Sequence, residues 1–97
     1  ADRVISVATS NHIRRMLREV VTVGTARRAE AEGYFVGGKT GTADKPIPGG
    51  YDRERVIAVF AAAFPIDDPD WVLVVMLDEA EDRSGDKPLR SSGLTAA

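Results

Sequence analysis

An ammonium group, two hydroxyl groups and a glycine come together in Lys39-Thr40-Gly41-Thr42, within a run of β-forming residues. The ammonium group attracts a carboxylate, a hydroxyl group donates a hydrogen bond to one, and the glycine lets a second backbone approach closely. On a strand, these groups can bind an extended peptide and direct one backbone N–H at a developing oxyanion. The segment therefore indicates chemistry on a peptide-like substrate.

The same lysine also completes a phosphate-binding pattern. Gly33 to Thr40 reads G-x-x-x-x-G-K-T, which is the P-loop spacing. A P-loop needs a strand before it and a helix after it, because the N-terminus of that helix faces the phosphate. Here the preceding residues have a helical pattern, and the prolines and glycines of Asp44 to Gly50 oppose a helix. A nucleotide-binding P-loop module is therefore the alternative function, and it requires other secondary structure.

A Ser-x-x-Lys spacing occurs at Ser84 and Lys87. Ser-x-x-Lys and Lys-Thr-Gly are both motifs of serine acyl transferases that bind β-lactams, and there the serine and lysine share a helical face. Gly85 and Pro88 oppose a helix at this point, so we interpret the match as a coincidence. The same enzymes carry a middle motif, S-x-N, which Thr9-Ser10-Asn11 loosely resembles. The expected place of these residues at a helix start favours capping instead.

Two helices are expected before this segment. Ser6 can cap the first, which ends near Gly24 and has apolar residues at i, i+3, i+4, i+7 and i+8. That apolar face consists of Ile13, Met16, Leu17, Val20 and Val21. The opposite, solvated face is expected to hold Arg14, Arg15, Arg18 and Glu19. Thr25 is expected to cap a shorter helix from Ala26 to Glu32, which stops at Gly33.

Three strands are expected, over Tyr34 to Ala43, Val56 to Phe64 and Trp71 to Leu77, with a loop from Asp44 to Asp52. The last two are apolar runs around a turn-forming segment, which is typical of an antiparallel hairpin. Because neither run alternates, we expect burial on both faces, with Trp71 in the core. The expected fold class is α/β of the α+β type, an antiparallel sheet with packed helices.

One long and one short helix are too few to cover both faces of such a sheet. The chain is therefore expected to be a piece of a larger domain, or a small interaction domain that self-associates to shield the bare face. With 97 residues, it holds a single core.

Composition excludes several kinds of partner. Thirteen Lys and Arg against fifteen Asp and Glu give a formal charge of -2, which supplies no field for binding nucleic acid. There is no cysteine and one histidine, His12, so we expect no disulfide, thiolate nucleophile or metal site. The longest apolar runs fall short of the roughly 20 residues of a membrane-spanning helix, and the chain is expected to be soluble.

The order of several short motifs resembles that of a known family. The motifs are Val4-Ile5-Ser6, Val20-Val21, Gly24-Thr25-Ala26, Gly33-Tyr34, Gly38-Lys39-Thr40-Gly41-Thr42-Ala43, Gly49-Gly50-Tyr51 and Leu77-Asp78-Glu79. From Arg3 to Glu79 the chain resembles the C-terminal part of the transpeptidase domain of class B penicillin-binding proteins, especially the cell-division type. The resemblance implies that residues 1–97 are an incomplete piece of the penicillin-binding/serine β-lactamase-like fold, lacking the nucleophile-bearing part and the final helix.

The resemblance further implies a serine D,D-transpeptidase that cross-links peptidoglycan and binds β-lactams. A stem peptide ending in D-Ala-D-Ala acylates the serine, and the amine of a neighbouring peptide releases it. Lys39 would support the electrostatics of the serine motifs and the substrate carboxylate, and Thr40 would hydrogen-bond that carboxylate. The Thr42 N–H would complete the oxyanion hole, and Gly41 would keep the strand open.

No cofactor is implied, and a chain with the Lys-Thr-Gly strand alone is expected to be inactive. The parent protein would be anchored in the inner membrane with this domain in the periplasm, and cell-division proteins would be its partners. Ala80 departs from the family pattern, because many members have proline there.

Overall fold

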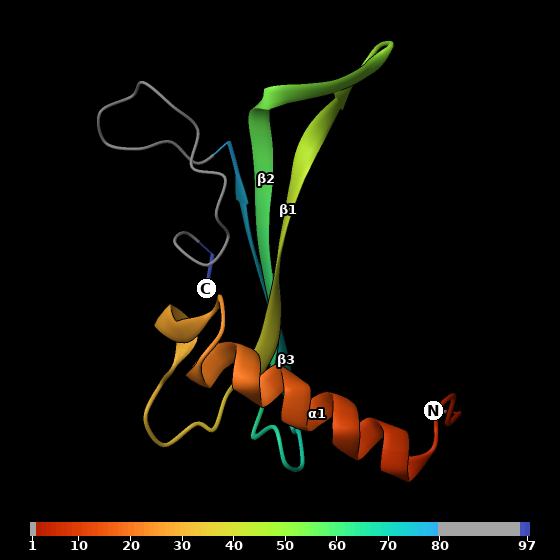
Figure 1. Ribbon diagram of the computed structural model, residues 1–97, viewed down its shortest axis with the longest axis vertical. Coiled ribbons are helices and arrows are strands. Elements are labelled where there is room, and N and C mark those ends of the chain that lie inside the picture. Colours follow the sequence, from red (N-terminus) through yellow and green to blue (C-terminus); the bar gives the residue numbers. More distant parts are fainter. Residues whose placement is uncertain (1, 80–95) are drawn as a thin grey trace.

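The computed structural model describes residues 2–79 and 96–97. Its elements are helix α1 (Val7–Thr22), the 3-10 turn η1 (Arg27–Ala29) and strands β1 (Gly37–Ile47), β2 (Gly50–Phe64) and β3 (Trp71–Asp78). The strands form one antiparallel sheet in the order β1-β2-β3, and α1 crosses it near the start of β1 (Figure 1). This arrangement confirms the expected α+β class. Ser84 and Lys87, the Ser-x-x-Lys match, lie outside the described residues.

Helix α1 begins as its sequence predicts. The Ser6 side chain accepts a hydrogen bond of 3.1 Å from the Thr9 backbone N–H, which satisfies a donor that the first turn leaves free. The helix ends at Thr22, and the Gly24 N–H donates to Glu19 O at 3.0 Å. A Cβ at Gly24 would lie 2.8 Å from Val20 Cα, so this close turn requires glycine.

The buried face of α1 differs from the apolar face expected from the sequence. Val21 is buried, but Met16 is 58% exposed. Arg14 and Arg18, expected in solvent, are half-buried because their guanidinium groups bind backbone carbonyls of the loops beside the helix. Arg14 donates to Ile66 O and Asp67 O. Arg15 remains exposed, as expected. Contacts of Arg14 and Arg18 with backbone carbonyls therefore hold this helix in place, together with the burial of Val21.

The expected second helix is wrong: only η1 forms between Ala26 and Glu32. No side chain caps this turn: its N-cap residue is Ala26, and the Thr25 hydroxyl group hydrogen-bonds to that of Thr40 in β1. Ala26 is fully buried, and its N–H donates to Val20 O at 3.1 Å, which ties the segment to the end of α1. The hydrogen bond from Ala26 to Val20 holds the start of the segment against α1, and the segment then makes the single 3-10 turn η1.

The expected loop from Asp44 to Asp52 is also wrong, since the two strands continue into a long hairpin with its turn at Pro48 and Gly49. The register shifts between Asp44, which pairs with Val56, and Lys45, which pairs with Asp52. This irregularity bends the hairpin, as its upper part shows in Figure 1. Gly49 has φ 87°, a turn conformation that favours glycine.

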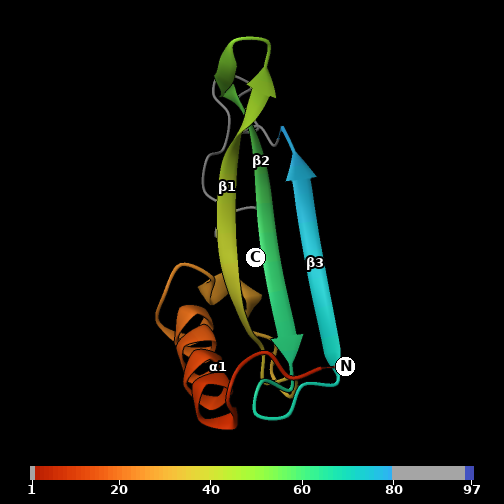
Figure 2. The ribbon, with the colours of Figure 1, turned by 90° about the vertical axis from the view of Figure 1, so that its right-hand side faces the viewer.

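The hairpin of β2 and β3 confirms the predicted antiparallel pairing, with Phe64 opposite Trp71. Burial on both faces is wrong. In β2 the buried residues alternate, namely Val56, Ala58, Phe60 and Ala62, and in β3 Trp71 is 66% exposed. The reason is that α1 lies beside β1, away from β3 (Figure 2), so β3 receives no helix within the described residues.

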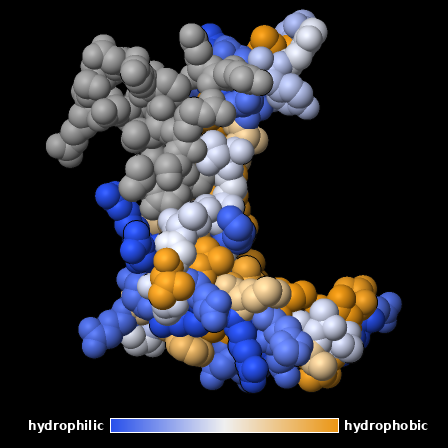
Figure 3. All heavy atoms as spheres, in the orientation of Figure 1, coloured by the Kyte–Doolittle hydropathy of each residue, from blue (hydrophilic) through white to orange (hydrophobic). Residues whose placement is uncertain are grey.

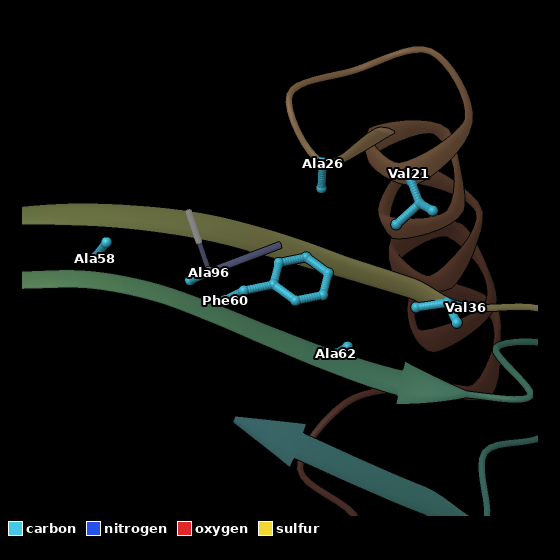
Figure 4. Close-up of a cluster of buried hydrophobic side chains, with 7 residues drawn as sticks. All are labelled: Val21, Ala26, Val36, Ala58, Phe60, Ala62 and Ala96. Carbon is cyan, nitrogen blue, oxygen red and sulfur yellow. The ribbon is translucent and has the colours of Figure 1, made fainter. Parts of the chain in front are cut away.

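The core lies between α1, the turn after it and one face of β1 and β2. It consists of Val21, Ala26, Val36, Ala58, Phe60, Ala62 and Ala96 (Figure 4). The molecule extends over 43 × 32 × 19 Å, and apolar side chains reach the surface along α1 and where α1 meets the strands (Figure 3). A core of this size leaves much apolar surface uncovered.

Candidate active-site strand

The Lys-Thr-Gly segment lies in the first half of β1, which is an edge strand of the described sheet. Thr40 pairs with Phe60 and Thr42 with Ala58, so both threonines belong to the face of the sheet that carries the core. Lys39 and Gly41 belong to the other face by the alternation of the strand. All four predicted site residues therefore lie on one continuous strand whose outer edge pairs with no strand among the described residues.

Lys39 and Thr40 form a small polar cluster. Lys39 Nζ donates to Thr40 O at 2.9 Å and to Thr40 Oγ1 at 3.3 Å. Among the side chains that the structure describes, no carboxylate forms an ion pair with this exposed ammonium group. The cluster therefore presents a positive charge and a hydroxyl group together, which suits an anionic ligand.

The glycines of β1 differ in their surroundings. A Cβ at Gly38 would lie 2.5 Å from Ala61 O, and one at Gly37 would lie 2.5 Å from Ile66 Cγ1. At Gly41, by contrast, a Cβ would have no neighbour within 4 Å. Packing within the chain thus requires Gly37 and Gly38, whereas Gly41 borders open space beside Lys39 and Thr40.

Thr25 joins the site from the turn that follows α1. Its Oγ1 lies 3.1 Å from Thr40 Oγ1, and either oxygen can be the donor. Sequence reasoning assigned Thr25 to a helix cap and missed this contact. Nothing local in the sequence signals it, because the two residues are 15 positions apart and meet only when the turn packs on β1.

Arg18 holds the segment that enters β1. Its guanidinium group donates to Val36 O at 2.7 Å, pairs with Glu30 at 2.8 Å and lies 4.6 Å from the centre of the Phe35 ring. Phe35 has φ 52°, a left-handed conformation that is unusual for this residue type. Three contacts from one side chain therefore fix the backbone just before the site, a role that the sequence pattern did not indicate.

A second charge cluster lies at the bend of the β1–β2 hairpin. Lys45 pairs with Asp78 at 2.9 Å and with Glu79 at 3.0 Å, and Arg55 pairs with Asp52 at 3.5 Å. The hydrogen bonds to Asp78 and Glu79 raise the pKa of Lys45 above its usual value. This lysine is thus bound to carboxylates, unlike Lys39.

The geometry contradicts the P-loop alternative. Lys39 and Thr40 lie within a strand that continues to Ile47, where a P-loop would require a helix. Within the described ranges, no three His, Cys, Asp or Glu side chains gather as a metal site would need. None of the described helices has the length and apolarity to cross a membrane.

Comparison with known proteins places these features in a family. The profile of the "Penicillin binding protein transpeptidase domain" matches residues 1–93. The chain is 42% identical over 78 residues to a "Peptidoglycan D,D-transpeptidase FtsI homolog" of Chlorokybus atmophyticus, covering 79% of this chain and 12% of that protein. It is 49% identical over 76 residues to "Stage V sporulation protein D" of Bacillus subtilis (strain 168), covering 78% of this chain and 12% of that protein.

Solved structures agree with the sequence matches. The transpeptidase domain of penicillin-binding protein 3 from Burkholderia pseudomallei is 35% identical, with a TM-score of 0.76 over 99% of this chain and 29% of that one. The transpeptidase domain of the FtsI4 D,D-transpeptidase from Legionella pneumophila is also 35% identical, with a TM-score of 0.75 over 95% of this chain and 32% of that one. The chain thus spans about an eighth of the relatives' length and about a third of a transpeptidase domain.

Proposed function

The chain belongs to the penicillin-binding protein transpeptidase domain family, and on that premise we propose that β1 forms one wall of the active site of a peptidoglycan D,D-transpeptidase. The observation that carries this proposal is the open space at Gly41 beside the Lys39–Thr40 cluster. In the full-length protein, a stem peptide ending in D-Ala-D-Ala acylates a serine located elsewhere, and the amine of a second peptide releases it. β-Lactams acylate the same serine.

Each residue of the segment has a role in this proposal. The Lys39 ammonium group attracts the substrate carboxylate, and the Thr40 hydroxyl donates a hydrogen bond to it. The Thr42 N–H contributes to the oxyanion hole that stabilises the tetrahedral intermediate. Gly41 carries no side chain that would obstruct the substrate, which approaches the strand closely.

Residues 1–97 then constitute the C-terminal portion of the transpeptidase domain. The coverage of about a third of the solved domains supports a partial domain, and the order of the short motifs from Arg3 to Glu79 supports its C-terminal place. The nucleophile and the middle motif belong to the remaining two thirds, and a final helix covers the sheet. The full-length protein is anchored in the inner membrane with this domain in the periplasm, where it works with cell-division proteins.

The test is acylation of the full-length protein by benzylpenicillin, followed by intact-mass spectrometry over time. Lys39→Met is expected to lower the acylation rate by about 100-fold or more, because it removes the charge that faces the carboxylate. Lys45→Met is the matched control, since it removes a lysine of the same strand that is bound to Asp78. Acylation of Lys39→Met at the wild-type rate would overturn the proposal.

A further inference from the structure

We propose that Thr25 is a positioning residue that orients the Thr40 hydroxyl group toward the substrate carboxylate. The proposal rests on the role assigned to Thr40 above, and adds a residue outside the Lys-Thr-Gly segment. Its starting point is the distance of 3.1 Å between Thr25 Oγ1 and Thr40 Oγ1.

The direction of this hydrogen bond follows from the capacity of a hydroxyl group. Such a group has one proton to donate and two lone pairs that accept. Lys39 Nζ donates to Thr40 Oγ1 at 3.3 Å and fills one lone pair. If Thr25 donates to the same oxygen, both lone pairs are filled, and the Thr40 proton remains for the carboxylate. In the reverse direction the Thr40 hydroxyl donates its hydrogen bond to Thr25 Oγ1, and a lone pair of Thr40 faces the anion.

Substrate binding therefore requires Thr25 to be the donor and Thr40 the acceptor. A carboxylate accepts hydrogen bonds and donates none, so it selects the arrangement in which Thr40 can donate. Each threonine side chain has a single hydroxyl proton to donate. The ammonium group of Lys39 supplies a further donor to the same cluster. Thr25 acts only through Thr40 and does not itself touch the substrate.

The two threonines are held at this distance by one packed cluster. Thr40 is the strand partner of Phe60, and Thr25 is the chain neighbour of Ala26. Phe60 and Ala26 belong to the same buried core, and the Ala26 side chain points from the turn toward β1 (Figure 4). The Ala26 N–H also donates to Val20 O at 3.1 Å. The end of α1 thus fixes the position of Thr25 relative to β1.

The experiment is a double-mutant cycle in the full-length protein, with Thr25→Val and Thr40→Val singly and together. Benzylpenicillin is the probe, and the dissociation constant of the non-covalent complex is separated from the acylation rate constant. Thr25→Val is expected to raise the dissociation constant of the non-covalent complex about three- to tenfold, because one hydrogen bond is lost. Thr25→Ser keeps a hydroxyl group and is expected to restore binding. With Thr40→Val present, Thr25→Val is expected to add no further loss.

Independent losses would overturn the proposal, because Thr25 would then support the fold without acting through Thr40. Equal loss in Thr25→Ser and Thr25→Val would also overturn it. If Thr40→Val alone leaves benzylpenicillin binding unchanged, the proposed function of Thr40 fails and this inference fails with it. If Thr40→Val weakens binding and Thr25→Val does not, only the inference about Thr25 fails.

Discussion

Lys45 Nζ lies 2.9 Å from Asp78 Oδ1, and this ion pair joins the bend in β1 to the end of β3 across the intervening strand. A register shift of this kind bends the strand locally. Here the same lysine also contacts Glu79, so two carboxylates hold the upper hairpin at one angle to the sheet.

The pH dependence of this bend follows from the direction of the pKa shift. Because the folded state raises the pKa of Lys45, the interaction is fully present below pH 10.5, the ordinary pKa, and is lost as the pH rises through the higher folded value. We expect the Ile47 methyl signal in ¹³C NMR to shift only above that pH. Lys45→Met removes this ion pair and leaves the rest of the hairpin unchanged, so it isolates the contribution of the lysine. A signal that shifts equally in Lys45→Met would contradict this prediction.

Arg18→Gln is expected to destabilise the chain by about 1–3 kcal/mol, because the half-buried carbonyl of Val36 loses its donor. Arg15→Gln removes the same charge from an exposed position of the same helix and is the matched control. Urea unfolding at one fixed protein concentration measures both. Equal effects of the two substitutions would show that the charge, and not the contact with Val36, stabilises the chain.

Gly38→Ala and Gly41→Ala are expected to separate stability from activity. The first places a Cβ 2.5 Å from Ala61 O and should cost about 1–3 kcal/mol of unfolding free energy. The second enters open space and should leave stability within about 0.5 kcal/mol. In the full-length protein, however, Gly41→Ala should slow acylation by benzylpenicillin about 10- to 100-fold, because the Cβ displaces the substrate. Unchanged acylation would mean that the substrate does not approach Gly41.

The isolated 97-residue chain is expected to form no covalent adduct with benzylpenicillin. Of the serines described, Ser6 caps α1 and its hydroxyl bonds to Thr9, and Ser10 lies within the helix, so neither has a lysine as its base. Intact-mass spectrometry after incubation is the measurement. A stoichiometric adduct on any serine would show that the chain contains a working nucleophile.

The isolated chain is also expected to self-associate through β3. Val72 and Met76 are 79% and 64% exposed, and β3 is an unpaired edge within the described sheet, which favours pairing with another copy. Analytical ultracentrifugation over a dilution series should show association that Val74→Lys reduces. Thr22→Lys adds the same charge at the end of α1 and should not reduce it. A folded monomer at micromolar concentration would contradict the prediction.

Local signals in the sequence determined several elements correctly. The Ser6 cap, the end of α1 and the β2–β3 hairpin each depend on residues within a few positions of one another, so they can be recognised without the rest of the fold. Lys39 and Thr40 lie on a strand as predicted, but β1 begins at Gly37, after the β-forming residues Tyr34 to Val36 that the expected strand included. The family resemblance rests on the same short motifs, and the comparisons confirm it.

Tertiary contacts decided the rest. Arg18 was expected in solvent, but a carbonyl at Val36, 18 positions away, binds it. Thr25 was expected to cap a helix, but Thr40 offers a partner once the turn packs on β1. Trp71 was expected in the core because its strand is apolar, yet burial depends on a covering layer. In each case the local pattern shows what a residue can do, and distant partners determine which of those possibilities is realised.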